Sequence, residues 1–251
     1  KPSATIAMSM KALELKAQGR DIISLSVGEP DFDTPDHICR AGIAAISNGQ
    51  TRYTAVDGTP ELKDAIIDKL KRDNSLSYQR SEILVSGGAK QSIYNMLQAT
   101  LDVGDEALIP APYWVSYPDM VRLADGEPVI LHTKAENNYL ISPQQLASAV
   151  NEKTRLLILN APSNPTGMGY SKAQLEALGR VLLDHPKVLI CSDDIYEHIW
   201  WGDEPFHNIA QVVPELKDRM VVVNGVSKAY AMTGWRIGYA AGPEALIAQM
   251  R

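Results

Sequence analysis

The chain has 251 residues, 45% of them hydrophobic, and a formal net charge of −6. This length and apolar content support a globular protein with a substantial core, and the negative charge argues against nucleic acid as a partner. No apolar run approaches the roughly 20 residues of a membrane span, and the N-terminal segment lacks the apolar stretch of a signal peptide.

The cysteines and histidines favour a reduced compartment and no metal. Cys39 and Cys191 form no spaced framework, and Cys191 lies in an apolar run, as a small core residue does. The five histidines offer no pair at the spacing of metal ligands. We therefore expect a cytoplasmic protein that binds no metal, no nucleic acid and no membrane.

Short apolar runs alternate with amphipathic segments along most of the chain, which predicts an α/β fold with a mostly parallel mixed sheet sandwiched by helices. Helices are expected to begin at capping, proline or glycine residues, namely at Thr59, Gly88, Ser142, Ser171 and Pro243. The expected strands are 82–86, 107–110, 128–132, 155–160, 188–192, 220–224 and 236–241. In such sheets ligands bind at the carboxyl ends of the strands.

Three stretches are punctuated by glycine or proline. Residues 26–32 (SVGEPDF) and 52–58 (RYTAVDG) are typical of loops. Residues 86–90 (SGGAK) join a strand to a helix, where glycines let a ligand approach the backbone and the first helical N–H groups attract a phosphate. A tight turn without any ligand explains this third pattern as well.

An aromatic and an amide residue follow two further strands. Trp114, in PYWVSYP, offers a flat surface for stacking a pyridine ring, although tryptophan more often packs in a core or interface. Asn164, in NAPSNPTG, lies in a rigid turn and could donate its amide to a phenolic oxygen. On turn chemistry alone, the second motif is simply a loop.

Asp193 and Tyr196 follow the apolar run KVLICS. A carboxylate at the end of a strand usually caps a helix or faces solvent. Beside a pyridine cofactor it would instead keep the ring nitrogen protonated, so that the ring withdraws electrons. Tyr196 could donate to the phenolic oxygen of such a cofactor, and its other interpretation is a core tyrosine.

Lys228 follows the buried-strand pattern MVVVNG, and Arg236 lies eight residues further on. Partial desolvation and a neighbouring cation lower the pKa of an amine, which can then attack a carbonyl and form a Schiff base. The planar arginine side chain suits a phosphate or a carboxylate. An isolated lysine would be interpreted as an ordinary solvated residue, but this lysine belongs to a set.

Taken together and in order, these motifs resemble the fold-type I pyridoxal-phosphate aminotransferases, and most closely the class-I aspartate aminotransferase group of bacterial type. The resemblance extends over essentially the whole chain, and its last motif is the most specific. The motifs that carry it are SVGEPDFDTP, YTAVDGTPELK, GGAKQ, PYWVSYPDM, NAPSNPTG, SDDIYEH and NGVSKAYAMTGWRIGY.

The resemblance implies a site for pyridoxal 5′-phosphate. Lys228 would carry the internal aldimine, and Asp193 would pair with the pyridine nitrogen. Asn164 and Tyr196 would hold the phenolic oxygen, while Trp114 would stack on the ring. The catalytic residues implied are therefore Lys228, Asp193 and Tyr196.

The resemblance also implies contacts to phosphate and substrate. Arg236 would bind the phosphate, helped by the start of a helix at Gly88, Ala89 and Lys90. Tyr53 matches a tyrosine that reaches the phosphate in the neighbouring subunit, so a homodimer with shared active sites is expected. Gly28 would line the site of the substrate carboxylate, and the substrate contacts implied as a group are Gly28, Trp114 and Asn164.

The chain departs from the family pattern at Gly225, where many relatives carry a hydroxyl residue, and at Asp194, where glutamate is commoner. Residues 1–35 are expected to contribute to a small domain and residues 36–251 to form the cofactor-binding large domain. Because the last expected helix reaches Arg251 without a cap, and the chain starts at Lys1, we expect residues to be missing at both ends.

The implied reaction is transamination by a ping-pong mechanism. An amino group would move from an L-amino acid, aspartate being the first choice, to a 2-oxo acid such as 2-oxoglutarate. The alternatives left open are prephenate, aromatic or alanine substrates, a related lyase or decarboxylase with the same cofactor, and a non-catalytic cofactor-binding fragment.

Overall fold

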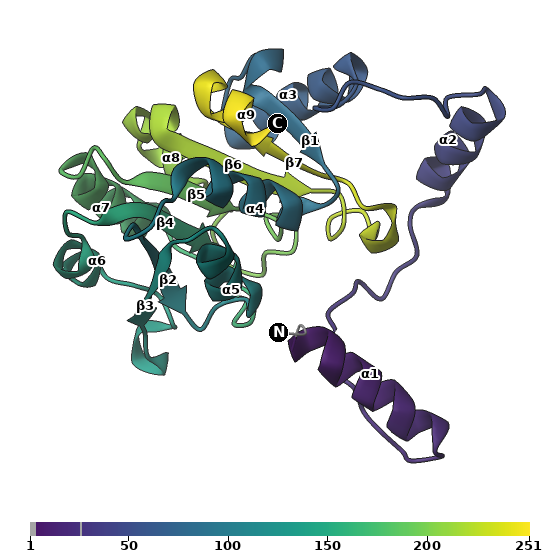
Figure 1. Ribbon diagram of the computed structural model, residues 1–251, viewed down its shortest axis with the longest axis horizontal. Coiled ribbons are helices and arrows are strands. Elements are labelled where there is room, and N and C mark those ends of the chain that lie inside the picture. The colour runs from purple at the N-terminus through teal and green to yellow at the C-terminus, as the bar shows by residue number, and fades with distance from the viewer. Residues whose placement is uncertain (1–3, 26) are drawn as a thin grey trace. The chain divides into compact units, whose positions relative to one another are not determined.

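The computed structural model describes residues 4–25 and 27–251 and comprises two compact units, residues 1–33 and 34–251 (Figure 1). In the first unit, helix α1 (Ala4–Ala17) is followed by a segment without regular structure. Ser26, the first residue of the SVGEPDFDTP motif, lies outside the described residues. That residues 1–35 belong to a small domain stays a prediction.

The second unit is built on a seven-stranded sheet whose order is β1-β7-β6-β5-β4-β2-β3. β7 pairs antiparallel with both of its neighbours, and the other pairs are parallel, so the predicted mostly parallel mixed sheet is confirmed. The strands are β1 (Ile83–Ser86), β2 (Glu106–Ala111), β3 (Glu127–His132), β4 (Thr154–Asn160), β5 (Leu189–Asp193), β6 (Met220–Gly225) and β7 (Gly238–Ala241).

Two hydrophobic clusters, one on each face, hold the sheet between two layers of helices (Figure 1). Along β4, Leu156 and Ile158 belong to one cluster and Leu157 and Leu159 to the other, because successive side chains of a strand point to opposite faces. The first cluster includes side chains of α4 (Ala89–Thr100), α5 (Ser116–Leu123) and α9 (Glu244–Met250). The second includes side chains of α3 (Pro60–Asn74), α6 (Pro143–Ala149), α7 (Lys172–Leu183) and α8 (Ile209–Val212).

The predicted helix starts are confirmed, and three of them use side-chain caps. Thr59 accepts the backbone N–H of the third residue of α3, and Ser142 and Ser171 do the same for α6 and α7. Gly88 precedes α4 with φ of 98°, a left-handed value that suits glycine. α3 continues to Asn74, four residues beyond the apolar pattern that ends at Leu70.

Other predicted boundaries were wrong. The last strand begins at Gly238 rather than at 236, because Arg236 has φ of 59° and follows the short 3-10 helix η4 (Thr233–Trp235). The helices α1, α2 (Asp36–Ser47), α5 and the short α8 were not predicted. α2 has no buried residue, and α5 has no side-chain cap at its start. No helix among the described residues is long and apolar enough to cross a membrane.

Candidate active site

Several of the predicted site residues lie where the parallel strands end. Asn160, the last residue of β4, is in register with Asp193, the last residue of β5, which in turn pairs with Val223 of β6. One step further, Gly225 of β6 is opposite Gly238 of β7. The carboxyl ends of β4, β5 and β6 therefore form one edge, as expected for a ligand site in such a sheet.

Asp193 is buried, with 4% of its surface exposed. Burial raises the pKa of its carboxyl group to about 6, although hydrogen bonds act in the opposite direction. The hydroxyl of Tyr117 donates to its Oδ2 at 2.5 Å, and the N–H of Ile195 donates to its Oδ1 at 3.4 Å. A positive charge next to this carboxylate would compensate for the loss of water around it.

Tyr117 is a site residue that sequence reasoning missed. It is fully buried, and its ring meets that of Trp114 edge to face, with centroids 5.4 Å apart. The N–H of Tyr117 donates to the carbonyl of Trp114 at 3.0 Å, in the turn that begins α5. The three-residue spacing of the two aromatics, typical of one helix face, was the available signal, but no helix was predicted for this segment.

Tyr196 and Asn164 form a hydrogen-bonded pair beside Asp193. Burial and the charge of Asp193 raise the pKa of Tyr196, while the hydrogen bond with Asn164 lowers it. The ammonium nitrogen of Lys228 lies over the ring of Tyr196, 5.8 Å from its centroid. The structure therefore brings together four of the predicted residues: Lys228, Asp193, Tyr196 and Asn164.

The backbone around Asn164 is tied to the strand that carries Asp193. The N–H of Asn164 donates to Oδ1 of Asn160 at 2.8 Å, and Nδ2 of Asn160 donates to the carbonyl of Asp193 at 2.9 Å. One asparagine side chain thus fixes the loop after β4 against the end of β5. Asn160 is the first residue of the NAPSNPTG motif, so this motif not only forms a turn but also connects the loop after β4 to the end of β5.

Two cations lie at the beginning of α4. Nη2 of Arg236 donates to the carbonyl of Gly87 at 3.2 Å, and a Cβ atom at Gly88 would overlap the Arg236 side chain. Burial, and then the charge of Arg236, lower the pKa of Lys90. The Lys90 ammonium lies 4.6 Å from the centroid of the Trp114 ring. Two cations close together at a helix N-terminus are an arrangement suited to an anion.

Glycines allow the elements of this edge to approach closely. A Cβ atom at Gly238 would overlap the backbone between Gly88 and Ala89, so β7 contacts the very start of α4. A Cβ atom at Gly225 would lie 2.9 Å from the carbonyl oxygen of Ile237. This contact gives a physical reason for glycine at position 225, where many members of the resembled family carry a hydroxyl residue.

The remaining predicted residues lie apart from this group or in the other unit. Tyr53 lies between α2 and α3 and its side chain is fully exposed, so within this one chain it is not packed into the site. Gly28 belongs to the unit of residues 1–33. The roles of both residues stay predictions.

A second carboxylate, Asp194, follows Asp193 directly and was not predicted to matter. It is buried and accepts hydrogen bonds from Ser192 Oγ at 2.7 Å and from Asn208 Nδ2 at 2.6 Å. Burial, together with the nearby charge of Glu197, raises the pKa of Asp194 to about 8. Asp193 and Asp194 therefore have separate hydrogen-bond partners.

Glu197 anchors the segment that carries Tyr196. Lys69 of α3 forms a salt bridge with its Oε1, and Asn74 donates to its Oε2 at 2.8 Å. Asn224, near the end of β6, donates to Oε1 at 2.7 Å. These contacts join α3, the end of β6 and the segment after β5 around the buried Glu197.

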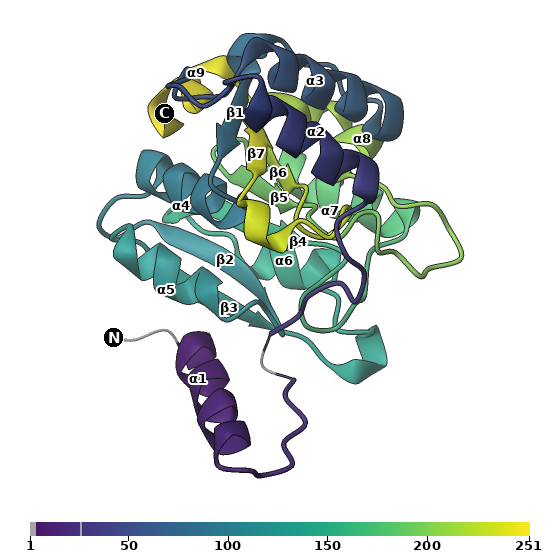
Figure 2. The same ribbon diagram turned by 90° about the vertical axis from the view of Figure 1, so that its right-hand side faces the viewer.

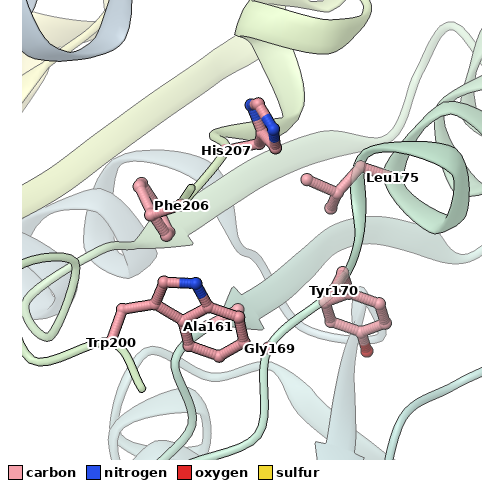
Figure 3. A pocket seen from close by; sticks show the side chains of 7 residues that line it. All are labelled: Ala161, Gly169, Tyr170, Leu175, Trp200, Phe206 and His207. Atoms are coloured by element: carbon pink, nitrogen blue, oxygen red, sulfur yellow. The ribbon is translucent and has the colours of Figure 1, made fainter. Parts of the chain in front are cut away.

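A small pocket elsewhere is not part of this site. Figure 3 shows Phe206 and the indole of Trp200 on one side of the pocket, Leu175 and Tyr170 on the other, and His207 at the top of the view. None of its seven lining residues belongs to the predicted set; they are Ala161, Gly169, Tyr170, Leu175, Trp200, Phe206 and His207. Among the residues 4–25 and 27–251, no group of three or more His, Cys, Asp or Glu side chains could hold a metal ion.

Comparison with known proteins supports the grouping. The sequence model of the family described as aminotransferase class I and II matches residues 20–251. A relative named aspartate/prephenate aminotransferase, from Nitrosomonas europaea, is 57% identical over 250 residues, which cover 100% of this chain and 63% of the relative.

Solved structures agree with the sequence comparison. The aspartate aminotransferase from Rhizobium meliloti matches with a TM-score of 0.94 at 47% identity, over 100% of this chain and 65% of that chain. The aspartate aminotransferase from Thermus thermophilus with maleate matches with a TM-score of 0.95 at 44% identity, over 100% of this chain and 64% of that chain. This chain thus spans less than two thirds of the length of these proteins.

Proposed function

The chain belongs to the class I and II aminotransferases, and we propose that its site binds pyridoxal 5′-phosphate and serves amino-group transfer between an amino acid and a 2-oxo acid. The observation that carries the proposal is the convergence of Lys228, Asp193 and the Tyr196–Asn164 pair at the carboxyl edge of the sheet. When bound, the cofactor supplies an aldehyde for an amine to attack and a protonated pyridine ring that withdraws electrons.

The residues present fit such a group at three points. The buried carboxylate of Asp193, whose pKa is raised by burial, suits a protonated ring nitrogen. The hydrogen-bonding side chains of Tyr196 and Asn164 suit a phenolic oxygen. Arg236 and Lys90, at the N-terminus of α4, suit a phosphate.

Each side chain then has a chemical role. Lys228 would bind the cofactor covalently through Nζ and, once released, would move a proton at the substrate Cα as general base. Asp193 would keep the ring nitrogen protonated, and Tyr117 would hold the carboxylate by its hydrogen bond. Trp114 would orient the ring by stacking.

The proposed substrates are aspartate as amino donor and 2-oxoglutarate as acceptor, with prephenate as a second acceptor. The support for prephenate is the name of the relative from Nitrosomonas europaea, aspartate/prephenate aminotransferase. Prephenate carries the same 2-oxo acid group as the other acceptors.

The proposed assembly is a homodimer, and its proposed location is the cytoplasm. The homodimer is supported by the full exposure of Tyr53 and by the exposed Ile43 and Ile46 of α2, a helix with no buried residue. A neighbouring subunit would cover these side chains and receive Tyr53 at its phosphate site.

The test is attachment of the cofactor to a single lysine. The chain is incubated with pyridoxal 5′-phosphate, reduced with borohydride and digested, and the labelled peptide is identified by mass spectrometry. We expect the label on Lys228 and none in Lys228→Ala. Label on another lysine, or normal oxaloacetate formation from aspartate and 2-oxoglutarate by Lys228→Ala, would contradict the proposal.

A further inference from the structure

The segment between Lys228 and Arg236 has a backbone that needs support from outside. Ala231 has φ of 49° and Arg236 has φ of 59°, left-handed values that a residue with a β-carbon adopts only at a cost in free energy. Such conformations persist where surrounding contacts determine them. The contacts that hold this segment therefore also set where its lysine and arginine lie.

A single hydroxyl group bonds to the segment at two places. Oγ1 of Thr34 donates to the carbonyl of Ala231 at 2.6 Å and accepts from Nε1 of Trp235 at 3.2 Å. Thr34 is about 200 positions away in sequence, so these are tertiary contacts. One bond is to Ala231, whose backbone is left-handed. The other is to Trp235, which directly precedes Arg236, the second residue with a left-handed backbone.

Helix α2, which begins two residues after Thr34, supports the same tryptophan. A Cβ atom at Gly42 would lie 2.8 Å from Cη2 of Trp235, so only glycine lets the indole lie this close to the helix. In Figure 2, α2 lies in front of the sheet, next to the short yellow helix that follows β6. The ring of Trp235 is therefore held at its edge by α2 and at its N–H by Thr34.

Both bonded residues lead directly to a site residue. The N–H of Ala231 donates to the carbonyl of Lys228 at 3.4 Å. Trp235 precedes Arg236, whose guanidinium donates to the carbonyls of Thr233 at 2.8 Å and of Gly87 at 3.2 Å. A shift of Trp235 would therefore move the arginine away from the start of α4.

We propose that Thr34 is a positioning residue, whose hydroxyl group fixes the segment 228–236 so that Lys228 and Arg236 are held in place before any ligand binds. The role of the two positioned side chains rests on the proposed function. The fixing of the segment itself does not, since it is a property of the chain alone. Thr34 acts through its hydrogen bonds to Ala231 and Trp235.

The test compares four variants by hydrogen–deuterium exchange without cofactor. Thr34→Val removes the hydroxyl at nearly constant volume, and Thr34→Ser keeps it. Trp235→Phe removes the indole N–H together with part of the ring that lies against Gly42. Thr100→Val is the matched control, because Oγ1 of Thr100 also donates to a carbonyl, that of Met96 at 2.7 Å, at the far end of α4.

We expect Thr34→Val to speed exchange in peptides covering 226–237 by roughly tenfold or more, because both hydrogen bonds of the Thr34 hydroxyl to this segment are lost. Trp235→Phe, which keeps the bond from Thr34 to Ala231, should also speed exchange in the same peptides, and Thr34→Ser and Thr100→Val should leave them as in the wild type. Pyridoxal 5′-phosphate should bind Thr34→Val about tenfold more weakly, because the segment must then be ordered on binding.

Two results would overturn the proposal. One is wild-type exchange of 226–237 in Thr34→Val. The other is faster exchange spread evenly over the whole sheet, which would mean that the hydroxyl serves general stability. Because exchange is measured without cofactor, it decides the role of Thr34 even if the labelling of Lys228 fails.

Discussion

Replacing Asp194 with asparagine should stabilise the cofactor-free protein, and more so as the pH rises. Asp194 is buried, and its pKa is raised to about 8 by burial and by the charge of Glu197. In the unfolded chain the same carboxyl group ionises near its ordinary pKa of 3.8. Between these two values the folded state binds one proton more than the unfolded state, so stability falls as the pH rises.

The size of the effect follows from the shift. One pKa unit corresponds to about 1.4 kcal/mol, so the free energy of unfolding should fall by roughly 2 kcal/mol between pH 6 and pH 8 through this group alone. Asparagine resembles the protonated acid: its amide can donate to Ser192 Oγ, and its oxygen can accept from Asn208 Nδ2, at the positions of the present bonds. Asparagine does not ionise, so this decrease in the free energy of unfolding with rising pH disappears.

Urea unfolding of both proteins at several pH values between 6 and 8.5, followed by tryptophan fluorescence, measures the difference. We expect the advantage of Asp194→Asn to grow by roughly 2 kcal/mol over this range. Asp203→Asn, an exposed substitution with the same change in charge, is the control. A constant difference between wild type and Asp194→Asn at every pH would refute the reasoning, because it would mean that Asp194 ionises alike in both states.

Two further substitutions probe the site. Tyr117→Phe removes the hydrogen bond that lowers the pKa of Asp193, so this pKa should rise above about 6. Pyridoxal 5′-phosphate should then bind roughly tenfold more weakly, as measured by fluorescence titration. Unchanged affinity would contradict the pairing of Asp193 with the ring nitrogen. Gly238→Ala places a methyl group in the backbone at Ala89 and should destabilise the fold by about 1–3 kcal/mol in urea unfolding while weakening cofactor binding; wild-type behaviour in both assays would mean that the start of α4 shifts freely.

The sheet could be predicted because its strands carry the strongest local signals. β4 and β6 are nearly continuous apolar runs, as strands covered on both faces must be, and turn residues end them. The caps at Thr59, Ser142 and Ser171 are equally local. Periodicity does not report pairing direction, and the antiparallel β7 could be placed only from the structure.

The missed parts depend on contacts between distant residues. Nothing near Thr34 in sequence indicates that its hydroxyl bonds to Ala231 and Trp235. The left-handed conformation of Arg236, which shortened β7, is likewise unusual for a residue that is not glycine. The candidate site residues were recognised by their type and order. Thr34 and Tyr117, which hold them, lie in the same motifs, but a motif does not reveal which distant atoms its residues contact.

The two adjacent aspartates, Asp193 and Asp194, have different surroundings and therefore different roles. Both are buried and both have a raised pKa, but Asp193 accepts from Tyr117 and lies beside Tyr196, whereas Asp194 accepts from Ser192 and Asn208. Asp193 needs a positive ligand to make its charge favourable, so cofactor binding should recover the free energy that its burial costs. Asp194 accepts two neutral donors and lies near the charge of Glu197, so it is better accommodated as the neutral acid. The cofactor should therefore stabilise the protein most above pH 6, where Asp193 without its partner would be charged and buried.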